Sequence, residues 1–544
     1  MNGQWAALPT GHVEGSSSSK REKGEEKMKR LRWIWQGDVY LKAVVLLAVM
    51  TSVVSFAYFY SQDMITAFGD AQSRLMIAKQ VVSGLHPGLV HLGGIWPPLP
   101  QAAMLPLIWN DFLYQSGIAG AVVSMVSYVV ATVFLYKLVV SVTENRVAGL
   151  IGVIAFSSPS ILYMQSVPMS EMPFIAFFVM CVYFLMLWVQ DVEKLRFLFL
   201  TALAVFLATL TRYEGWVLFW VVTVVIVFAF WKNRFSYAKA EGHFVFFATL
   251  ALFGVILWFA WNQAIFGDLL YFLRSEYSVR AINEAEIARI LPSQRTGGNL
   301  LLAFQVYGRT VLDNAGWITT GVSILGLISL FFTRIESTQK LVVSILLFPF
   351  MFSVLTLYEG VVTVILHPAF TEGQYWNLRY GVLMLPAVGF FTGFLTEKGK
   401  WLGFSVLLLI VVSAILTWQG GIITVKDALH AKISQGEQIQ EAAGERLKNN
   451  YDGGLVLMQR RTNEHTVFVS TLSLSNVIYE GDQDIWEESL QDPTKHARWV
   501  FMRERDGVPD KVWKALHSTP QLLDNYDLVY QNGGIEIYKR KPTL

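Results

Sequence analysis

Two acids stand at the edges of long apolar runs in this chain. Asp70 lies in Gly69-Asp70-Ala71-Gln72-Ser73-Arg74, just after the first run, and Glu171 follows Ser170 where a later run begins. A carboxylate in such a place can act as a general base or bind a metal ion. The structural alternative is helix capping, because Asp is favoured at helix N-caps and negative charge is stabilised near helix N-termini.

Arginines occupy comparable positions. Arg212 and Glu214 lie in the tight connection Thr211-Arg212-Tyr213-Glu214-Gly215, and Arg379-Tyr380 opens a late apolar run. Arginine suits phosphate because its planar guanidinium donates paired hydrogen bonds. Alternatively, Arg212 pairs with Glu214 or with solvent, and Arg379 is an anchor whose charged end reaches water. The segment 263–316 contains five more arginines among several acids: Arg274, Arg280, Arg289, Arg295 and Arg309. For most of them, a solvated amphipathic helix is the simpler explanation.

Membrane-spanning helices are the elements expected to position these residues. The 544 residues are 53% hydrophobic and only 15% charged, whereas soluble domains are about 25% charged. Apolar runs long enough to cross a ~30 Å hydrocarbon core recur between 40 and 420. We expect a polytopic α-helical protein with about eleven spans, at 41–60, 117–139, 147–163, 172–190, 197–211, 214–231, 244–262, 317–333, 340–358, 378–395 and 401–418.

Lysine and arginine in short loops predict the orientation, because basic loops stay cytoplasmic. The basic loops 144–146, 191–196, 232–239, 334–340 and 396–400 all fall on the side of the basic N-terminal stretch. The acids and arginines described above fall on the opposite side, with the longest loops. We therefore expect a plasma-membrane protein with its N-terminus in the cytoplasm and its C-terminus outside, although the endoplasmic reticulum stays open.

Three regions follow from the composition. Residues 1–38 are expected to form a disordered basic cytoplasmic tail, 39–420 the membrane domain with functional outer loops, and 421–544 an extracytoplasmic domain. A helical stretch at 434–449 precedes strand-like runs at 454–458, 477–479, 499–502, 527–530 and 535–538, with a helix near 509–517. Strands alternating with helices predict a small α/β fold, which we interpret as a structural or acceptor-positioning module.

Several function classes are disfavoured. The net charge of +2 and the lack of a long basic tract give no sign of nucleic-acid binding. The single cysteine, Cys181, excludes an intrachain disulfide and a cysteine-based metal site.

The chain resembles the GT-C superfamily of membrane glycosyltransferases, in particular the branch of the protein O-mannosyltransferases and the lipid A aminoarabinose transferase. The resemblance rests on Gly69-Asp70-Ala71, Ser170-Glu171, the 211–215 connection, and Arg379-Tyr380 followed by Leu383-Met384-Leu385-Pro386. Relatives often carry two adjacent acids in the first loop, but Ala71 follows Asp70 here, so a need for a divalent cation stays open. No Trp-Trp-Asp motif is present, which disfavours block transfer to asparagine.

The resemblance implies an inverting glycosyltransferase whose donor is a sugar on a polyprenyl or dolichyl phosphate. It implies that Asp70 is the catalytic base, that Glu171 shapes the acceptor site, and that Arg379 and Arg212 contact the phosphate. We add Arg74, Glu214 and Tyr380 as candidate substrate-binding residues. The acceptor can be a protein, a lipid or a glycan. The competing hypotheses are a secondary transporter or lipid flippase, whose ionisable residues are expected near the bilayer midplane, and a non-catalytic assembly or receptor protein.

Overall fold

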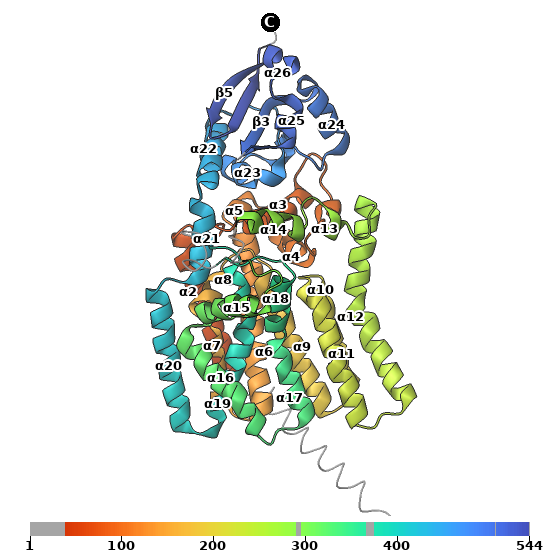
Figure 1. Ribbon diagram of the computed structural model, residues 1–544, viewed down its shortest axis with the longest axis vertical. Coiled ribbons are helices and arrows are strands. Elements are labelled where there is room, and N and C mark those ends of the chain that lie inside the picture. The colour runs from red at the N-terminus through yellow and green to blue at the C-terminus, as the bar shows by residue number, and fades with distance from the viewer. Residues whose placement is uncertain (1–38, 290–294, 366–374, 506, 543–544) are drawn as a thin grey trace, which may run out of the picture.

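The computed structural model describes residues 39–289, 295–365, 375–505 and 507–542, so the predicted tail 1–38 lies outside the described residues. A bundle of long helices fills the lower part of Figure 1, and a C-terminal sheet with its helices lies at the top. Short helices are inserted between the two. We call the end of the bundle next to these short helices the sheet-facing end.

Each predicted span falls on helix. The bundle helices are α2 (Val39–Ser61), α6 (Ile118–Thr143), α7 (Arg146–Phe156), α8 (Pro159–Met164), α9 (Glu171–Gln190), α10 (Leu195–Thr209), α11 (Glu214–Lys232), α12 (Tyr237–Phe266), α15 (Leu300–Ala315), α16 (Trp317–Phe332), α17 (Ser337–Ser344), α18 (Phe348–Tyr358), α19 (Leu385–Leu395) and α20 (Lys400–Gln419). In the described part of the chain, eight helical segments are long and apolar enough to cross a membrane, or nine if the bent pair α15–α16 counts as one.

Two predicted spans are shorter than a bilayer crossing requires. The segment 147–163 is two helices, because Ser158 caps α8 through the backbone N–H of Ile161 and Pro159 stands at its first turn. Proline lacks the N–H that would continue the preceding helix. The segment 197–211 forms α10, which has 15 residues. The helix α16 meets α15 at 109°, so the region 300–332 is a broken element.

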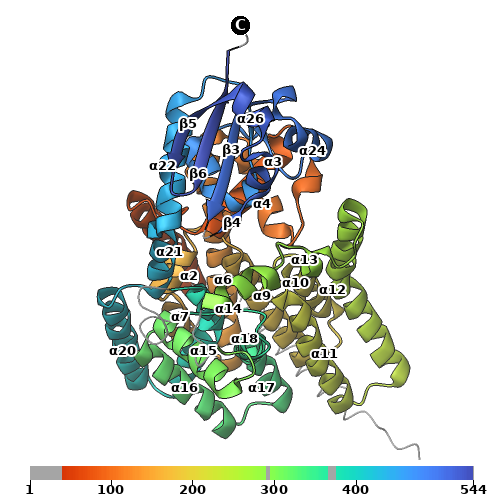
Figure 2. The same cartoon turned by 45° about the horizontal axis from the view of Figure 1, so that its top comes forward.

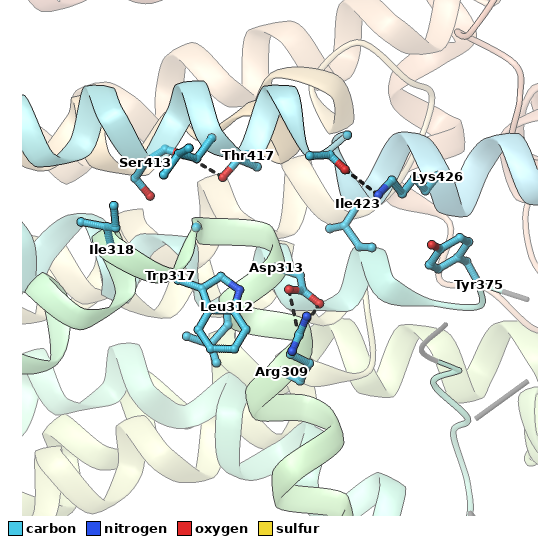
Figure 3. A pocket seen from close by; sticks show the side chains of 14 residues that line it. Arg309, Leu312, Asp313, Trp317, Ile318, Tyr375, Ser413, Thr417, Ile423 and Lys426 are labelled. Carbon is cyan, nitrogen blue, oxygen red and sulfur yellow. Dashed lines mark hydrogen bonds and ion pairs between the residues drawn. The ribbon is translucent and has the colours of Figure 1, made fainter. Parts of the chain in front are cut away.

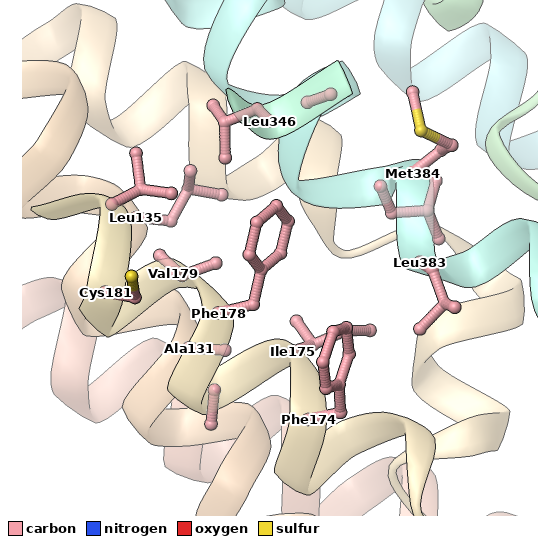
Figure 4. Close-up of a cluster of buried hydrophobic side chains, with 14 of the residues drawn as sticks. Ala131, Leu135, Phe174, Ile175, Phe178, Val179, Cys181, Leu346, Leu383 and Met384 are labelled. Atoms are coloured by element: carbon pink, nitrogen blue, oxygen red, sulfur yellow. The ribbon is translucent and has the colours of Figure 1, made fainter. Parts of the chain in front are cut away.

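The helix α9 is the centre of the bundle, and 89% of its apolar window is buried. Figure 4 shows Phe174, Ile175 and Phe178 of α9 pointing toward Leu383 and Met384, with Ala131 of α6 alongside. Helices α7 and α19 approach very closely, since a Cβ on Gly393 would lie 2.5 Å from the carbonyl oxygen of Ala148. Small residues at such contacts stabilise membrane helix pairs because backbones can then pack directly.

The sheet-facing end carries short helices and irregular segments. These are α3 (Gly69–Val82), η1 (Leu89–His91), α4 (Leu99–Ile108), α5 (Asp111–Gln115), α13 (Tyr271–Arg274), α14 (Val279–Arg289) and the 3-10 helix η4 (Leu378–Met384), which leads directly into α19. Figure 1 places α3 below α23 of the C-terminal fold, and Figure 2 shows α3 behind the sheet when the top is turned forward. The Lys79 ammonium joins α3 to α5 by an ion pair with Asp111 at 2.7 Å.

The C-terminal part is an α/β fold, as predicted. Its sheet has the order β2-β1-β3-β6-β5, with β4 on β3; β1 pairs in parallel with β2 and β3, and β3, β6 and β5 are antiparallel. The elements are α21 (Ile423–Ile433), α22 (Gln435–Asn450), β1 (Leu455–Leu457), α23 (Glu464–Ser470), β2 (Val477–Ile478), α24 (Gln483–Gln491), β3 (Ala497–Arg505), β4 (Val508–Pro509), α25 (Lys511–Leu516), α26 (Pro520–Asn525), β5 (Tyr526–Asn532) and β6 (Ile535–Arg540). The remaining short 3-10 helices are η3 (Ile345–Leu347), η5 (Thr396–Lys398), η6 (Arg460–Thr462), η7 (Leu474–Asn476) and η8 (Pro493–Lys495).

Candidate active site

Asp70 and Arg379 form an ion pair although 309 residues separate them. Asp70 lies in the first turn of α3, Arg379 lies in η4, and Nη2 of the arginine donates to Oδ2 at 2.6 Å. The capping explanation for Asp70 is wrong, because Phe68 occupies the N-cap of α3 and no side chain caps it. The Asp70 side chain is 38% exposed and that of Arg379 only 11%, so the carboxylate is the accessible partner.

Glu171 is buried at the start of α9, with its side chain 1% exposed. Its Oε1 accepts a hydrogen bond from Arg212 Nη1 at 3.0 Å and lies 3.4 Å from Arg379 Nε. Ser170 Oγ also accepts from Arg212, at 3.0 Å. The second carboxylate oxygen of Glu171 has no hydrogen-bond partner. Glu171 therefore joins two arginines from different parts of the chain and keeps an unused acceptor.

Arg212 pairs with Glu214, as one of the two hypotheses expects, and it also points into the protein, whereas its contact with phosphate stays a prediction. The Arg212–Glu214 ion pair is 2.6 Å long. Burial would lower the pKa of Arg212, but Glu214 and Glu171 raise it above the ordinary arginine value. A Cβ on Gly215 would lie 2.4 Å from the carbonyl oxygen of Ala208, which explains the glycine in this tight connection.

The Tyr380 ring lies beside both charge pairs. Its centroid is 5.3 Å from the Arg212 guanidinium and 5.4 Å from that of Arg379, within the range of a cation–π contact. The hypothesis of Arg379 as a water-exposed anchor is wrong, because the residue is buried among Phe68, Tyr380 and the two acids. Tyr380 thus fills the space between the two arginines.

Arg74 is buried on α3, one turn after Asp70, and forms no ion pair with any described acid. Its guanidinium lies 4.4 Å from the Trp96 ring, and its Nε has no hydrogen-bond partner. Burial lowers the pKa of Arg74 to about 10, although Asp70 and Glu171 raise it. Its charge is therefore the least compensated of the three arginines.

Trp96 is held over Arg74 by the connection that carries Arg212. Tyr213 Oη donates to the Ile95 carbonyl at 2.7 Å, and the Leu99 N–H donates to the Leu210 carbonyl at 2.9 Å. The sequence does not reveal this contact, because Trp96 and Arg74 lie 22 positions apart and nothing local indicates that they are neighbours. The arginine–acid cluster, as we call this site, comprises Asp70, Arg74, Glu171, Arg212, Glu214 and Arg379, with Trp96 and Tyr380 against it.

The arginines of 263–316 lie in other places. Arg274, Arg280 and Arg309 pair with nearby acids and have side chains 66%, 75% and 53% exposed. Exposed pairs of this kind are what the solvated-helix hypothesis expects. Residues 290–294 and the side chain of Arg289 lie outside the described residues. Within the described ranges, no group of three or more His, Cys, Asp or Glu side chains is arranged to hold a metal ion.

A separate groove of about 480 Å³ lies between α15, α16, α20 and α21. Figure 3 shows Arg309 and Asp313 paired on one side of it, with Ser413 and Thr417 of α20 opposite. None of the residues of the arginine–acid cluster lines this groove. The groove and the cluster are therefore distinct features of the sheet-facing region.

The cluster has the components of an anion site next to a carboxylate. Two arginines are paired with Glu171, a third, Arg74, is buried without an ion pair of its own, and the Asp70 carboxylate is partly exposed. Guanidinium groups held in a buried site bind phosphate strongly because little solvent competes for them.

Comparison with protein-family models gives no match, and neither does comparison with curated protein sequences. Solved structures do match. ArnT from Cupriavidus metallidurans bound to undecaprenyl phosphate has a TM-score of 0.59 at 13% identity, over 92% of this chain and 98% of ArnT. The apo form of the same protein also gives 0.59 at 13% identity, over 91% and 98%. Archaeal AglB from Archaeoglobus fulgidus, in complex with an inhibitory peptide and a dolichol-phosphate, gives 0.45 at 10% identity, over 93% and 75%.

The two ArnT matches confirm the expected resemblance at the level of fold. ArnT is the lipid A aminoarabinose transferase of the GT-C superfamily. The chain is similar to ArnT over nearly the whole length of both proteins. It therefore has the same overall fold as ArnT.

Proposed function

We propose that the protein is an inverting glycosyltransferase that moves a sugar from a polyprenyl or dolichyl phosphate to an acceptor hydroxyl or amine. The observation that carries this proposal is the Asp70–Arg379 ion pair next to the buried Arg74, which forms no ion pair of its own. One site thus offers a base for the acceptor and cations for a lipid phosphate. The ArnT fold supports the same donor class, because ArnT was solved with undecaprenyl phosphate bound.

The donor phosphate enters beside Arg74 and competes with Asp70 for Arg379. The arginine then pairs with the phosphate, which frees the Asp70 carboxylate to accept the acceptor's proton. The acceptor oxygen or nitrogen attacks the anomeric carbon, and the bond from that carbon to the phosphate oxygen breaks. The electron pair stays on the lipid phosphate, where Arg379, Arg212 and Arg74 stabilise the added charge. Attack opposite the leaving group inverts the anomeric centre.

Glu171, Glu214 and Tyr380 act on the arginines in this proposal. Glu171 fixes Arg212 and sits beside Arg379, and Glu214 holds the other side of Arg212. Anchored guanidinium groups lose little freedom when substrate binds, which is the advantage of a preorganised site. The unpartnered oxygen of Glu171 is available to an acceptor group that can donate a hydrogen bond.

We place the site at the outer face of the plasma membrane. The basic connections between α11 and α12 and between α19 and α20 lie at the opposite end of the bundle from the C-terminal sheet (Figure 1). Positive loops remain cytoplasmic, so the N-terminus is inside, and the cluster and residues 421–544 are outside. The C-terminal α/β fold covers α3, which carries Asp70 and Arg74, and this position suits acceptor positioning.

The test is donor turnover by the purified full chain in nanodiscs. The protein is incubated with a lipid extract of its own source membranes, and polyprenyl-phosphate lipids are followed by mass spectrometry. Loss of a polyprenyl-phosphate sugar with matching gain of free polyprenyl phosphate supports the proposal. Turnover of no such lipid, together with movement of a labelled lipid or solute across a sealed vesicle, would favour the transporter or flippase hypothesis.

A further inference from the structure

A buried acid outside the predicted site contacts the backbone that carries Arg379. Asp427 lies on α21 and is 3% exposed. Its Oδ2 accepts a hydrogen bond from the backbone N–H of Arg379 at 3.3 Å. The contact is therefore to the main chain at the start of η4, and the Arg379 guanidinium remains directed at Asp70.

The η4 segment needs such support because of its local conformation. Asn377, immediately before it, has a φ of 59°, in the left-handed region. Asn377 Nδ2 donates to the Thr363 carbonyl at 2.9 Å. The first N–H groups of a helix have no partner within the helix, so a buried carboxylate at this end satisfies them. Asp427 thereby fixes the position of the Arg379 main chain, from which the guanidinium extends to Asp70.

The same helix also contacts the approach to Asp70. Lys432, five residues after Asp427, donates to the backbone carbonyl of Asp63 at 2.9 Å and pairs with its carboxylate at 2.5 Å. Asp63 lies between α2 and α3, just upstream of Asp70. One helix is therefore attached to both segments that bring Asp70 and Arg379 together.

We propose that Asp427 is a positioning residue that holds Arg379 at its place against Asp70, and that α21 acts as the clamp between the two. The expected effect on transfer rests on the proposed function, whereas the geometric role of Asp427 does not. Since α21 leads directly into α22 and the C-terminal sheet, the clamp also ties the covering fold to the reacting groups. Displacement of a catalytic group by about 1 Å can cost on the order of 100-fold in rate.

Three substitutions in the full chain test the role of Asp427. Asp427→Ala removes both acceptor atoms, Asp427→Asn retains one amide oxygen, and Lys426→Ala is the control on the same helix. Lys426 bonds to the Gly420 carbonyl and lines the separate groove, away from η4. We expect a 10- to 100-fold loss of kcat in Asp427→Ala, roughly the cost of a misplaced catalytic group. Asp427→Asn should recover most of that loss, and Lys426→Ala should match the wild type.

A double-mutant comparison with Arg379 distinguishes a positioning role of Asp427 from a general effect on stability. In an Arg379→Ala background, where no side chain is left to position, adding Asp427→Ala should lower kcat by no more than about 2-fold, because contacting residues that act together are not additive. A full 10-fold additional loss in that background would overturn the inference. Wild-type kcat in the single Asp427→Ala variant, measured per folded protein, would also overturn it.

A structural measurement keeps this inference separate from the proposed function. A cryo-electron microscopy map of Asp427→Ala, or of Asp427→Leu if the alanine variant does not fold, shows the Arg379–Asp70 geometry even if no transfer is ever found. Displacement of η4 with loss of the ion pair supports the clamp. An unchanged ion pair in whichever of these two variants folds refutes it, whatever the chemistry of the site proves to be.

Discussion

Both ends of the helix bundle carry ion pairs, but the pairs differ in how exposed their side chains are. At the end away from the sheet, Lys239 pairs with Glu193 at 2.5 Å, and these side chains are 36% and 72% exposed. At the sheet-facing end, Arg212 pairs with Glu171 at 3.0 Å, and these side chains are 13% and 1% exposed. The partners are of the same chemical kind at similar distances, so burial is the difference.

Burial changes what such a pair indicates. Exposed pairs contribute between 0 and about 1 kcal/mol, because water and salt screen them. A buried pair costs several kcal/mol of desolvation for each ion, and apolar residues of similar volume often stabilise a fold as well or better. Ionisable groups retained inside a membrane protein therefore indicate function. The difference in burial supports the proposal that the chemistry takes place at the sheet-facing end, whereas the other end carries an exposed, solvated pair.

The largest expected effect is that of Asp70→Asn. Loss of a general base typically costs about 100- to 10,000-fold in rate, and the substitution preserves the shape of the side chain. We expect transfer to fall by that factor while donor binding persists, as measured by single-turnover kinetics in nanodiscs. Wild-type kcat in a folded, inserted Asp70→Asn variant would contradict the role of the exposed carboxylate.

Arg379→Ala should give the next largest effect. It removes the cation that faces Asp70 and Glu171, and loss of one preorganised charge-stabilising group costs about 100- to 1,000-fold. Arg379→Lys should recover part of the loss because it restores the charge without the planar fork. The measurement is kcat for both variants beside Arg309→Ala, whose arginine is exposed. A lysine variant no better than alanine would show that shape, rather than charge, is required at this position.

Arg74→Ala should mainly weaken donor binding. Its guanidinium has no acid partner among the described residues, so removing it leaves no buried acid unpaired. We expect a roughly 10-fold rise in the KM for the donor, which corresponds to loss of one charge-assisted hydrogen bond of about 1.5 kcal/mol. Arg274→Ala, at an exposed arginine, is the control. A fall in kcat with unchanged KM would instead place Arg74 in the chemical step.

Glu464 extends the comparison to an acid in the C-terminal fold. Burial raises the pKa of Glu464 to about 8, although Arg460 and Arg461 lower it. The folded chain then keeps this proton where the unfolded chain has lost it, so stability falls as pH rises from about 4.5 to about 8. Glu464→Gln stays neutral and should raise Tm at pH 8 by about 2–4 °C, with less change at pH 5. An equal Tm shift at pH 5 and pH 8, measured by scanning calorimetry in nanodiscs, would show that the titration of Glu464 does not affect stability.

The smallest effect is expected for the exposed pair. Lys239→Ala and Glu193→Ala, singly or together, should change stability by less than about 1 kcal/mol and leave kcat unchanged. Thermal unfolding and the transfer assay in nanodiscs measure the two quantities. A loss of activity comparable to that of Arg379→Ala would remove the distinction between the two ends of the bundle.

The sequence predicts the elements and the candidate residues better than their partners. Asp70, Glu171, Arg212 and Arg379 are visible because charged residues at the edges of apolar runs are rare. The Asp70–Arg379 pair could not be predicted, because it depends on a contact across 309 positions. The Asp427 contact is equally non-local, since it joins a helix to the main chain of another segment.

Two errors have local causes that the sequence contains. The break in the segment 147–163 is marked by Ser158-Pro159, a common helix start that apolar content alone does not reveal. The capping hypothesis for Asp70 placed the helix boundary too late, since α3 begins at Gly69. The exact residue at which a helix begins depends on neighbouring packing. An error of one or two residues in that boundary is enough to assign Asp70 to the N-cap when it lies in the first turn.

The most direct test of the account is native mass spectrometry of the full chain with undecaprenyl phosphate, for the wild type and the double variant Arg74→Ala/Arg379→Ala. The account predicts one bound polyprenyl phosphate on the wild type and its loss in the double variant. Binding of ordinary phospholipids should be unchanged between the two proteins. Equal binding of undecaprenyl phosphate to both proteins, or to neither, would contradict a lipid-phosphate site in the arginine–acid cluster.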